Sequence, residues 1–239
     1  MSVNSSRRQK PLPALTEEQR RIRGDFQRHW LEVLSKRFGL VERFNHRYPL
    51  RTFSPQVKRT LEVGAGRGAH LKFENLVQQE YVALELQPEL AEVIHASYPT
   101  VRVAVGDCQE QIDYPDGYFD RVLAIHVLEH LQNLPGALDH IHRVLRPTGF
   151  LSVLIPCDPG LAYSVARNIS ARRIFEKRYK QSYEWFVTSE HINPPEEVIS
   201  ELRSRFSIIH QAYWPLRIPI VGLNLVMGLT LTHLSLHVS

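Results

Sequence analysis

The sequence contains very little cysteine, since Cys108 and Cys157 are the only two among 239 residues. At most one bridge could form, so we expect a hydrophobic core rather than disulfides to hold the fold together. The first residues show no basic, apolar and small-residue leader, which predicts a cytoplasmic protein. Hydrophobic residues make up 43% of the chain and aromatic residues 9%. This composition excludes an intrinsically disordered or collagen-like chain.

Long uninterrupted apolar runs are also lacking. Residues 214–232 come nearest, with about the length that a membrane-spanning helix needs, but they include two prolines, two glycines and Arg217 before residue 229. Two β-rich runs separated by a loop of this kind fit an antiparallel hairpin better. We therefore expect no spanning segment, and contact with a lipid surface stays open.

Charge is unevenly distributed along the chain. The formal net charge is +4, yet residues 1–59 hold 14 Lys and Arg against 5 Asp and Glu, a balance of +9. A basic arm can attract nucleic acid, a lipid surface or a phosphorylated substrate. An Arg-rich helix face in water gives the same count, and we favour that interpretation.

The pattern divides the chain into five segments. They are a disordered lead-in at 1–15, N-terminal helices at 16–57, a core at 58–156, a helical insertion at 157–192, and a final helix with a hairpin at 193–239. Thr16 followed by two glutamates and periodic apolar residues predicts a capped amphipathic helix, and a shorter helix is expected at 41–46.

Short apolar strands alternate with helices from residue 58 onward. The strands are predicted at 60–63, 81–86, 101–105, 119–125 and 150–155, and helices are predicted after Gly68, at 87–96 and at 126–144. Such alternation is typical of a parallel sheet covered on both faces. A helix at 194–205 and strands at 206–214 and 223–232 would complete it. The fold class is therefore α/β, with a seven-stranded, mostly parallel sheet and a closing antiparallel hairpin.

A glycine-rich run follows the first of these strands. Its sequence is Glu62-Val63-Gly64-Ala65-Gly66-Arg67-Gly68, and Glu85 ends the second strand 21 residues after Gly64. Glycines there allow a ligand to approach the backbone, and ligands of open α/β sheets bind at the carboxyl ends of the strands. Gly64, Gly66 and Ala69 also fit the dinucleotide fingerprint, so a dehydrogenase stays open at this point.

Three further stretches, together with the glycine-rich run, resemble the class I S-adenosylmethionine-dependent methyltransferases. The likeness is greatest to the branch that includes the ubiquinone and menaquinone C-methyltransferases. The stretches are residues 84–89, residues 106–108 with 114–120, and residues 126–131 with 143–149. The resemblance implies a Rossmann-like methyltransferase fold, S-adenosylmethionine as methyl donor and S-adenosylhomocysteine as product.

The resemblance also implies a cofactor site. Its residues would be Glu62, Gly64, Ala65, Gly66, Gly68, Glu85, Leu86, Asp107, Cys108 and His126. Glu62 and the glycines would line the methionine and ribose side, and Glu85 would accept hydrogen bonds from the ribose hydroxyls. Asp107 would receive the adenine amino group, and the backbone N–H of Cys108 would face a ring nitrogen.

Four polar residues are candidates for the chemistry: His126, Glu129, His130 and His191. Methyl transfer to a hydroxyl gains from a general base, which predicts a catalytic role for His126 or His191. Some relatives place an acid and then Glu-His at the matching helix positions, which implies a divalent-metal site as an alternative. Purely structural hydrogen bonds are the third interpretation.

Acceptor binding is expected at the N-terminal helices and at residues 157–192, because the sheet edge would hold the cofactor. Basic side chains there suit a phosphate or carboxylate, whereas the aromatic ones also fit a core of the insertion. We expect a small-molecule acceptor with an oxygen nucleophile, with an amphiphilic or lipid-linked one as a variant. An RNA methyltransferase and a non-catalytic adenosyl-binding scaffold remain the rival functions, and no base-methylation motif favours the first.

Overall fold

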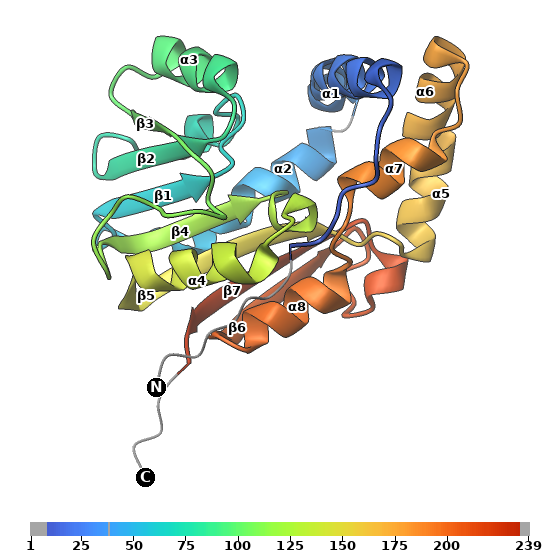
Figure 1. Ribbon diagram of the computed structural model, residues 1–239. Helices are drawn as coiled ribbons and strands as arrows, with labels where there is room; N and C mark the ends of the chain where they lie inside the picture. The colour runs from blue at the N-terminus through green and yellow to red at the C-terminus, as the bar shows by residue number, and fades with distance from the viewer. Residues whose placement is uncertain (1–8, 38, 235–239) are drawn as a thin grey trace.

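The computed structural model describes residues 9–37 and 39–234, with the side chains of residues 30–37 left out. Its centre is a seven-stranded sheet in the order β3-β2-β1-β4-β5-β7-β6 (Figure 1). The strands are β1 (Arg59–Val63), β2 (Glu80–Glu85), β3 (Arg102–Val105), β4 (Phe119–Ile125), β5 (Leu145–Pro156), β6 (Phe206–Trp214) and β7 (Val226–His233). The predicted mostly parallel sheet of seven strands is confirmed.

The sheet brings the carboxyl ends of its parallel strands to one edge. β1 pairs in parallel with β2 and β4, β2 with β3, and β4 with β5. β7 runs antiparallel between β5 and β6, as the predicted hairpin requires. Buried residues of β1, β4, β5 and β7 form the main core, which explains why the central strands are nearly continuous apolar runs.

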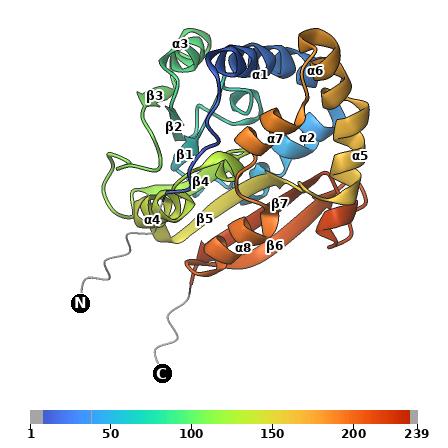
Figure 2. The same cartoon turned by 45° about the vertical axis from the view of Figure 1, so that its right-hand side comes forward.

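Helices cover both faces of the sheet and extend beyond its carboxyl edge (Figures 1 and 2). They are α1 (Glu17–Arg37), α2 (Gly39–Arg47), α3 (Pro88–Ser97), α4 (Leu134–Val144), α5 (Leu161–Ile169), α6 (Ala171–Tyr179), α7 (Glu184–Glu190) and α8 (Pro195–Arg203). Short 3-10 turns are η1 (Pro49–Thr52), η2 (Leu71–Phe73), η3 (Leu128–His130) and η4 (Val221–Leu223). No helix within the described ranges is both long and apolar enough to cross a bilayer.

The start of α1 follows the predicted capping pattern. The Gln19 backbone N–H donates to Thr16 Oγ1 at 3.1 Å, and the Thr16 N–H donates to Gln19 Oε1 at 2.9 Å. This reciprocal pair is a capping box. Of the predicted lead-in, residues 1–8 lie outside the described residues, and Lys10 is held by the carbonyl of Gln132 and that of Ile192, both at 3.0 Å.

Two predicted helices are wrong in part. The chain after Gly68 forms turns and the short η2 rather than an α-helix, because the Glu74 side chain turns inward to a buried arginine and the chain then returns to β2. The stretch predicted as one helix at 126–144 is divided into η3 and α4. The Asn133 side chain starts α4 by accepting from the Gly136 N–H at 3.1 Å, which separates the two elements.

The helices α1, α6 and α7 form a second, smaller core of their own beyond the sheet edge. Phe26 of α1 is 1% exposed and its ring centroid lies 5.0 Å from that of Phe175 and 5.1 Å from that of Phe186. Figure 2 shows α1, α6 and α7 together on the side to which the carboxyl ends of the strands point. Aromatic residues of the 157–192 segment therefore serve mainly as a core of this cap.

Candidate functional site

The glycine-rich bend lies between β2 and the residues that follow β4. Gly64, Gly66 and Gly68 have φ values of +65°, +58° and +75°, a region that side chains disfavour. A Cβ at Gly64 would come within 2.5 Å of Val127 Cγ2, whereas a Cβ at Gly66 would meet no atom within 4 Å. The bend thus packs tightly on one side and leaves open space at Gly66.

Glu85 points its carboxylate at this bend. Oε2 accepts a hydrogen bond from the Gly66 N–H at 2.7 Å and Oε1 accepts one from the Gln87 N–H at 3.0 Å. The side chain is 5% exposed. Leu86, the next residue, is 58% exposed, so the open edge begins directly after Glu85.

Asp107 and Cys108 follow β3, the strand next to β2. Asp107 Oδ1 accepts hydrogen bonds from the backbone N–H and the side-chain amide of Gln109, at 2.8 and 3.1 Å. Burial and then the neighbouring Asp107 charge raise the pKa of Cys108 to about 12. The Cys108 thiol therefore stays un-ionised at neutral pH and is no nucleophile.

Glu62 lies in the interior beneath the bend. Its Oε2 accepts a hydrogen bond from Tyr81 Oη at 2.8 Å, and burial raises its pKa. The hydrogen bond from Tyr81 joins β2 to β1 in the interior. Its expected role beside the methionine part of the cofactor stays a prediction.

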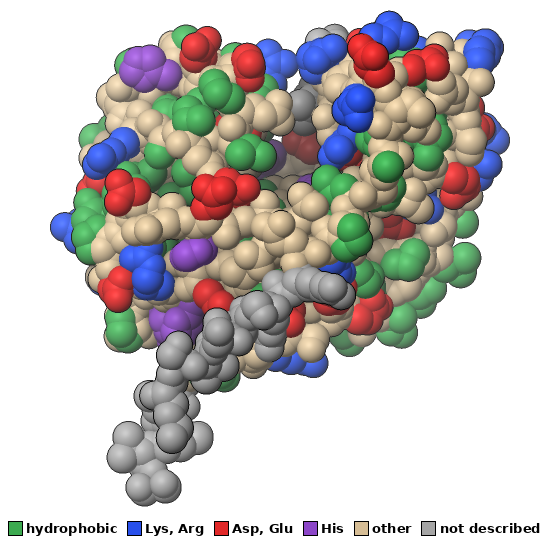
Figure 3. All heavy atoms as spheres, in the orientation of Figure 1, with side chains coloured by type: hydrophobic (Ala, Val, Ile, Leu, Met, Phe, Trp, Pro, Cys, Tyr) green, Lys and Arg blue, Asp and Glu red, His purple; other side chains and the backbone are tan. Residues whose placement is uncertain are grey.

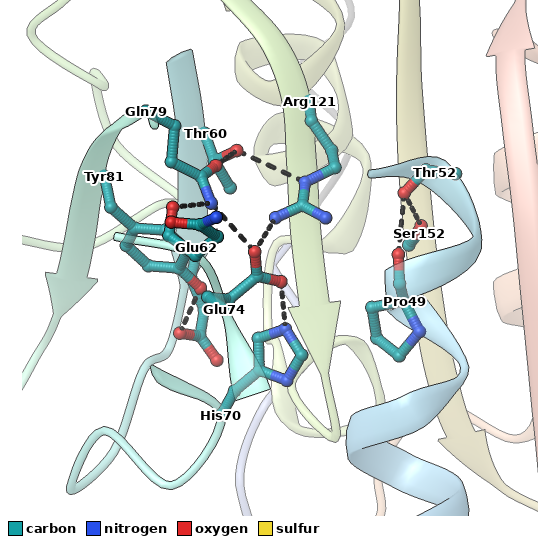
Figure 4. Close-up of polar contacts among 11 residues, drawn as sticks. Pro49, Thr52, Thr60, Glu62, His70, Glu74, Gln79, Tyr81, Arg121 and Ser152 are labelled. Carbon is teal, nitrogen blue, oxygen red and sulfur yellow. Dashed lines mark hydrogen bonds and ion pairs between the residues drawn. The ribbon is translucent and has the colours of Figure 1, made fainter. Parts of the chain in front are cut away.

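A buried ion pair joins the segment after the bend to β4 (Figure 4). Glu74 accepts from Arg121 at 2.6 Å and from His70 at 2.8 Å, and Arg121 has no exposed surface. Burial alone would raise the pKa of Glu74, but His70 and Arg121 outweigh it and bring the pKa to about 2. Our sequence analysis missed this pair. The signal was an arginine in the middle of an apolar strand, which needs a buried partner.

His126 and His130 flank the buried Glu129 at the end of β4. His126 has a φ of +54°, so it lies in a left-handed turn and not on the predicted helix. Its Nδ1 is 3.3 Å from Glu129 Oε1, and His130 Nε2 is 3.8 Å from the same oxygen. Burial would raise the pKa of Glu129, but the hydrogen bond with His126 and the surrounding histidines lower it. The carboxylate is therefore charged at neutral pH.

His191 is brought to the same place from far along the chain. The backbone N–H groups of Ile192 and Asn193 donate to the Glu129 carbonyl at 3.0 and 3.1 Å. His191 Nδ1 donates to Asp158 Oδ2 at 2.8 Å, and Arg167 Nη1 donates to both Asp158 oxygens at 2.8 Å. Burial opposes protonation of His191, but the bond to Asp158 and nearby carboxylates outweigh it and raise the pKa.

Asp158 was not predicted as a site residue. It is the second residue after β5, at the carboxyl edge, so its position after the fifth strand was the signal available. Arg167 was expected only as an acceptor-binding group. The structure instead places its guanidinium against Asp158, where it fixes the carboxylate that orients His191.

Three of the four metal-candidate residues meet closely. One ligating atom from each of Glu129, His130 and His191 lies within 4.8 Å of the others, and His126 is outside this group. Nδ1 of His130 donates to the Glu190 carbonyl at 2.7 Å, so both grouped histidines have their Nε2 lone pair available. Glu129 Oε2 is buried without a hydrogen-bond partner among the described residues. This donor set fits a divalent cation of the zinc or manganese type.

The bend, the acids and the histidines lie at the carboxyl edge of the sheet. Figure 3 shows the surface recessed between α3 and α1, with acidic and histidine side chains visible inside it. Glu85 ends β2, Asp107 follows β3, His126 follows β4 and Asp158 follows β5. Since these strands are parallel, their carboxyl ends bring the predicted residues and Asp158 to one edge of the sheet.

Comparison with known proteins agrees with this arrangement. Residues 61–153 match the family model described as a methyltransferase domain. The chain carries an S-adenosylmethionine-dependent methyltransferase domain. The predicted resemblance is thereby confirmed, and the matched residues run from β1 through most of β5.

Relatives of this methyltransferase domain carry more than one activity in their names. The ubiquinone/menaquinone biosynthesis C-methyltransferase UbiE of Coxiella burnetii is 29% identical over 98 residues, which cover 38% of this chain and 39% of that protein. The mitochondrial arginine-hydroxylase NDUFAF5 of Rattus norvegicus is 33% identical over 94 residues, 37% of this chain and 26% of that protein. The similarity thus spans less than half of each curated relative.

The fold is shared over a longer stretch. A crystal structure of an S-adenosylmethionine-dependent methyltransferase from Archaeoglobus fulgidus superposes with a TM-score of 0.62 at 16% identity. The match covers 85% of this chain and 99% of that one. The agreement in fold therefore extends beyond residues 61–153.

Proposed function

We propose that the protein transfers a methyl group from S-adenosylmethionine to a hydroxyl group of a small-molecule acceptor, with His191 as general base. The observation that supports this best is the Asp158–His191 contact at the carboxyl edge of β5. The bend with Glu85 and Asp107 supports the choice of cofactor. Glu85 would bind the ribose hydroxyls, and Asp107 the adenine amino group.

The chemistry follows from the position of the proton on His191. Because Nδ1 donates to Asp158, the neutral ring has its lone pair on Nε2, which takes the proton of the acceptor hydroxyl. S-adenosylmethionine, when bound, supplies a methyl group activated by the sulfonium. The acceptor oxygen would form a bond to that carbon while the carbon–sulfur bond would break with its electron pair going to sulfur. The cap formed by α1, α6 and α7 would exclude water from this step.

The cofactor assignment is tested by titrating the protein with S-adenosylhomocysteine in a calorimeter. Glu85→Gln is expected to weaken binding about tenfold to a hundredfold, since hydrogen bonds to a charged group are lost. Glu89→Gln, on the exposed side of α3, is the matched control and should bind as the wild type does. Equal affinity of both variants would refute the assignment of Glu85.

The base assignment is tested by turnover on a panel of phenolic and alcoholic acceptors. His191→Gln is expected to lower kcat by about a hundredfold or more with S-adenosylhomocysteine binding retained. His95→Gln, exposed on α3, is the control, and His126→Gln tests the alternative base. Tight adenosyl binding with no turnover on any acceptor would favour a binding scaffold instead.

A divalent-cation site is the second candidate, and the close grouping of Glu129, His130 and His191 favours it. A cation held there would bind adjacent oxygens of the acceptor and lower the pKa of its hydroxyl. Calorimetry of chelator-treated protein with Zn²⁺ or Mn²⁺ should then show one site that Glu129→Gln abolishes. With His191 acting as a base, chelation would leave turnover unchanged, so the two proposals have opposite outcomes.

A further inference from the structure

An apolar surface lies beside the cap, on α5 and the loop that follows β6. Six large apolar side chains form it, here called the apolar face: Leu161, Val165 and Ile169, which are 68%, 50% and 58% exposed, and Leu216, Ile218 and Ile220, which are 55%, 38% and 52% exposed. The α5 members recur every four residues and so lie on one side of the helix. Figure 3 shows apolar side chains gathered at the lower right, over the region where Figure 1 draws α5 and η4.

α5 lies against η4, the turn at the end of the loop that holds Leu216, Ile218 and Ile220. A Cβ on Gly160, which precedes α5, would come within 3.0 Å of Gly222 Cα and 3.3 Å of the Val221 carbonyl. α5 has no buried residue, so its apolar side faces outward. Single exposed apolar residues such as Val77 are ordinary on a protein surface, whereas a continuous group of this kind marks a binding surface.

The sequence on both sides of the apolar face has no acidic residue. Residues 159–175 and residues 202–239 contain no Asp or Glu. Arg173, Lys177 and Arg217 are exposed. Within the part of the chain that the structure describes, none of these three cations forms an ion pair. An apolar surface that carries an exposed cation, Arg217, between Leu216 and Ile218 complements an anionic partner that is itself apolar below its surface.

The loop between β6 and β7 has its backbone bonded internally. Asn224 has no exposed surface; its Oδ1 accepts from the Leu216 N–H at 3.0 Å, and its Nδ2 donates to the carbonyls of Ile218 and Ile220 at 2.9 Å. The Ile220 N–H donates to the Ile218 carbonyl at 2.8 Å. A loop that enters an apolar phase needs its peptide groups satisfied in this way.

From these four features we infer that the apolar face docks on the surface of an anionic lipid bilayer. The apolar side chains would enter the boundary between headgroups and acyl chains, and the cations would meet the lipid phosphates. A second copy of the chain fits less well, because a two-fold contact would bring the same cations opposite one another. A protein partner would need acidic side chains opposite the cations, and its polar groups would find no polar partner on the apolar side chains.

The docking surface adjoins the proposed site through α5. Arg167 of this helix holds Asp158, the partner of His191, while Val165 and Ile169 face outward. Resting on the proposed function, this arrangement favours an acceptor that is amphiphilic and reaches the site from the bilayer. Docking itself requires neither cofactor nor turnover, so the docking inference and the proposed function can be refuted separately.

The test is flotation of the full chain with vesicles of phosphatidylcholine, with and without phosphatidylglycerol, in the absence of any adenosyl compound. We expect binding only to the anionic vesicles and weaker binding as salt is raised. The double variant Leu216→Ser, Ile218→Ser should bind at least about tenfold more weakly, and Arg217→Gln about fivefold more weakly. All substituted positions are exposed, and circular dichroism checks that the variants fold.

The matched controls are Val77→Ser and Lys58→Gln, both exposed at the opposite edge of the sheet, which should bind as the wild type does. No flotation with anionic vesicles would overturn the inference, as would equal loss of binding in the controls. Sedimentation velocity without vesicles supplies the remaining outcome. A dimer that Leu216→Ser, Ile218→Ser dissociates would assign the apolar face to a contact between copies.

Discussion

Gly64 and Gly66 share a left-handed backbone but differ in what surrounds them. Alanine at either position costs about 1–2 kcal/mol of backbone strain, and at Gly64 its Cβ would also overlap Val127. We therefore expect Gly64→Ala to lower the melting temperature clearly more than Gly66→Ala. Gly66→Ala should instead act mainly on S-adenosylhomocysteine affinity, because its Cβ enters open space beside Glu85. Thermal unfolding and calorimetry of both variants check this, and an equal loss of stability would contradict it.

At the same scale, Asp158 sets the protonation of His191. As a base His191 must be neutral, so kcat/KM should rise with pH through its raised pKa and level off above it. Asp158→Asn removes the charge that favours the protonated ring, which moves the acid limb to lower pH. It should also lower the plateau by at least about a hundredfold, because the amide no longer selects the Nδ1–H tautomer. If the acid limb of the pH profile stays in place in Asp158→Asn, the group that titrates there is not His191.

Among the elements, the segment after the bend depends on the buried pair of Arg121 and Glu74. Arg121→Met would leave the Glu74 carboxylate buried without its cation, and we expect a loss of about 3–5 kcal/mol in unfolding free energy. The double variant Arg121→Met, Glu74→Gln should recover part of this loss, since no buried charge remains unpaired. Urea denaturation measures both, with Lys58→Met as the exposed control. No recovery in the double variant would contradict the pairing.

The same pair predicts how the fold responds to acid. The pKa of Glu74 falls from its usual 4.5 to about 2 on folding, so the ionised carboxylate stabilises the fold above pH 4.5. That stabilisation is lost as the pH falls from about 4.5 towards 2. The double variant Arg121→Met, Glu74→Gln should therefore lose less stability than the wild type over this interval. Denaturation series at pH 5 and pH 3 measure the loss of unfolding free energy between these two pH values. An equal loss in the wild type and the double variant would contradict the prediction.

In the molecule as a whole, the cap has a core separate from that of the sheet. Phe26 joins α1 to α6 and α7, and Phe26→Ala should destabilise the cap by about 3–5 kcal/mol. Trypsin should then cut near Arg178 and Lys180 much faster, while S-adenosylhomocysteine affinity changes little. Leu40→Ala, at a position that is 70% exposed, should change neither. Unchanged cleavage in Phe26→Ala would mean that the cap does not depend on this contact.

Local pattern predicted most of the sheet and the cofactor edge. Six of the seven strands were expected within three residues of their ends, and β7 begins three residues late because Asn224 keeps the preceding residues in the loop. The fifth was wrong at its start: β5 begins at Leu145 and not at Phe150, because Leu145 already pairs with Phe119 of β4 where a turn was predicted. The helix after Gly68 was wrong because Glu74 bonds to Arg121, a partner 47 residues away that no periodicity indicates. The face shared by His126, Glu129 and His130 was expected on a helix, and a left-handed turn at His126 arranges them instead.

The sequence by itself determined the alternating strands, the glycine bend and the acids that follow the strands, because each depends on residues near one another in the chain. Only the tertiary structure decided that His191 meets Asp158 and Glu129, that Arg167 supports the site, and that α5 and residues 216–220 share one outer surface. These contacts join segments up to 62 residues apart, from Glu129 to His191, and their geometry is set by how the cap packs on the sheet edge.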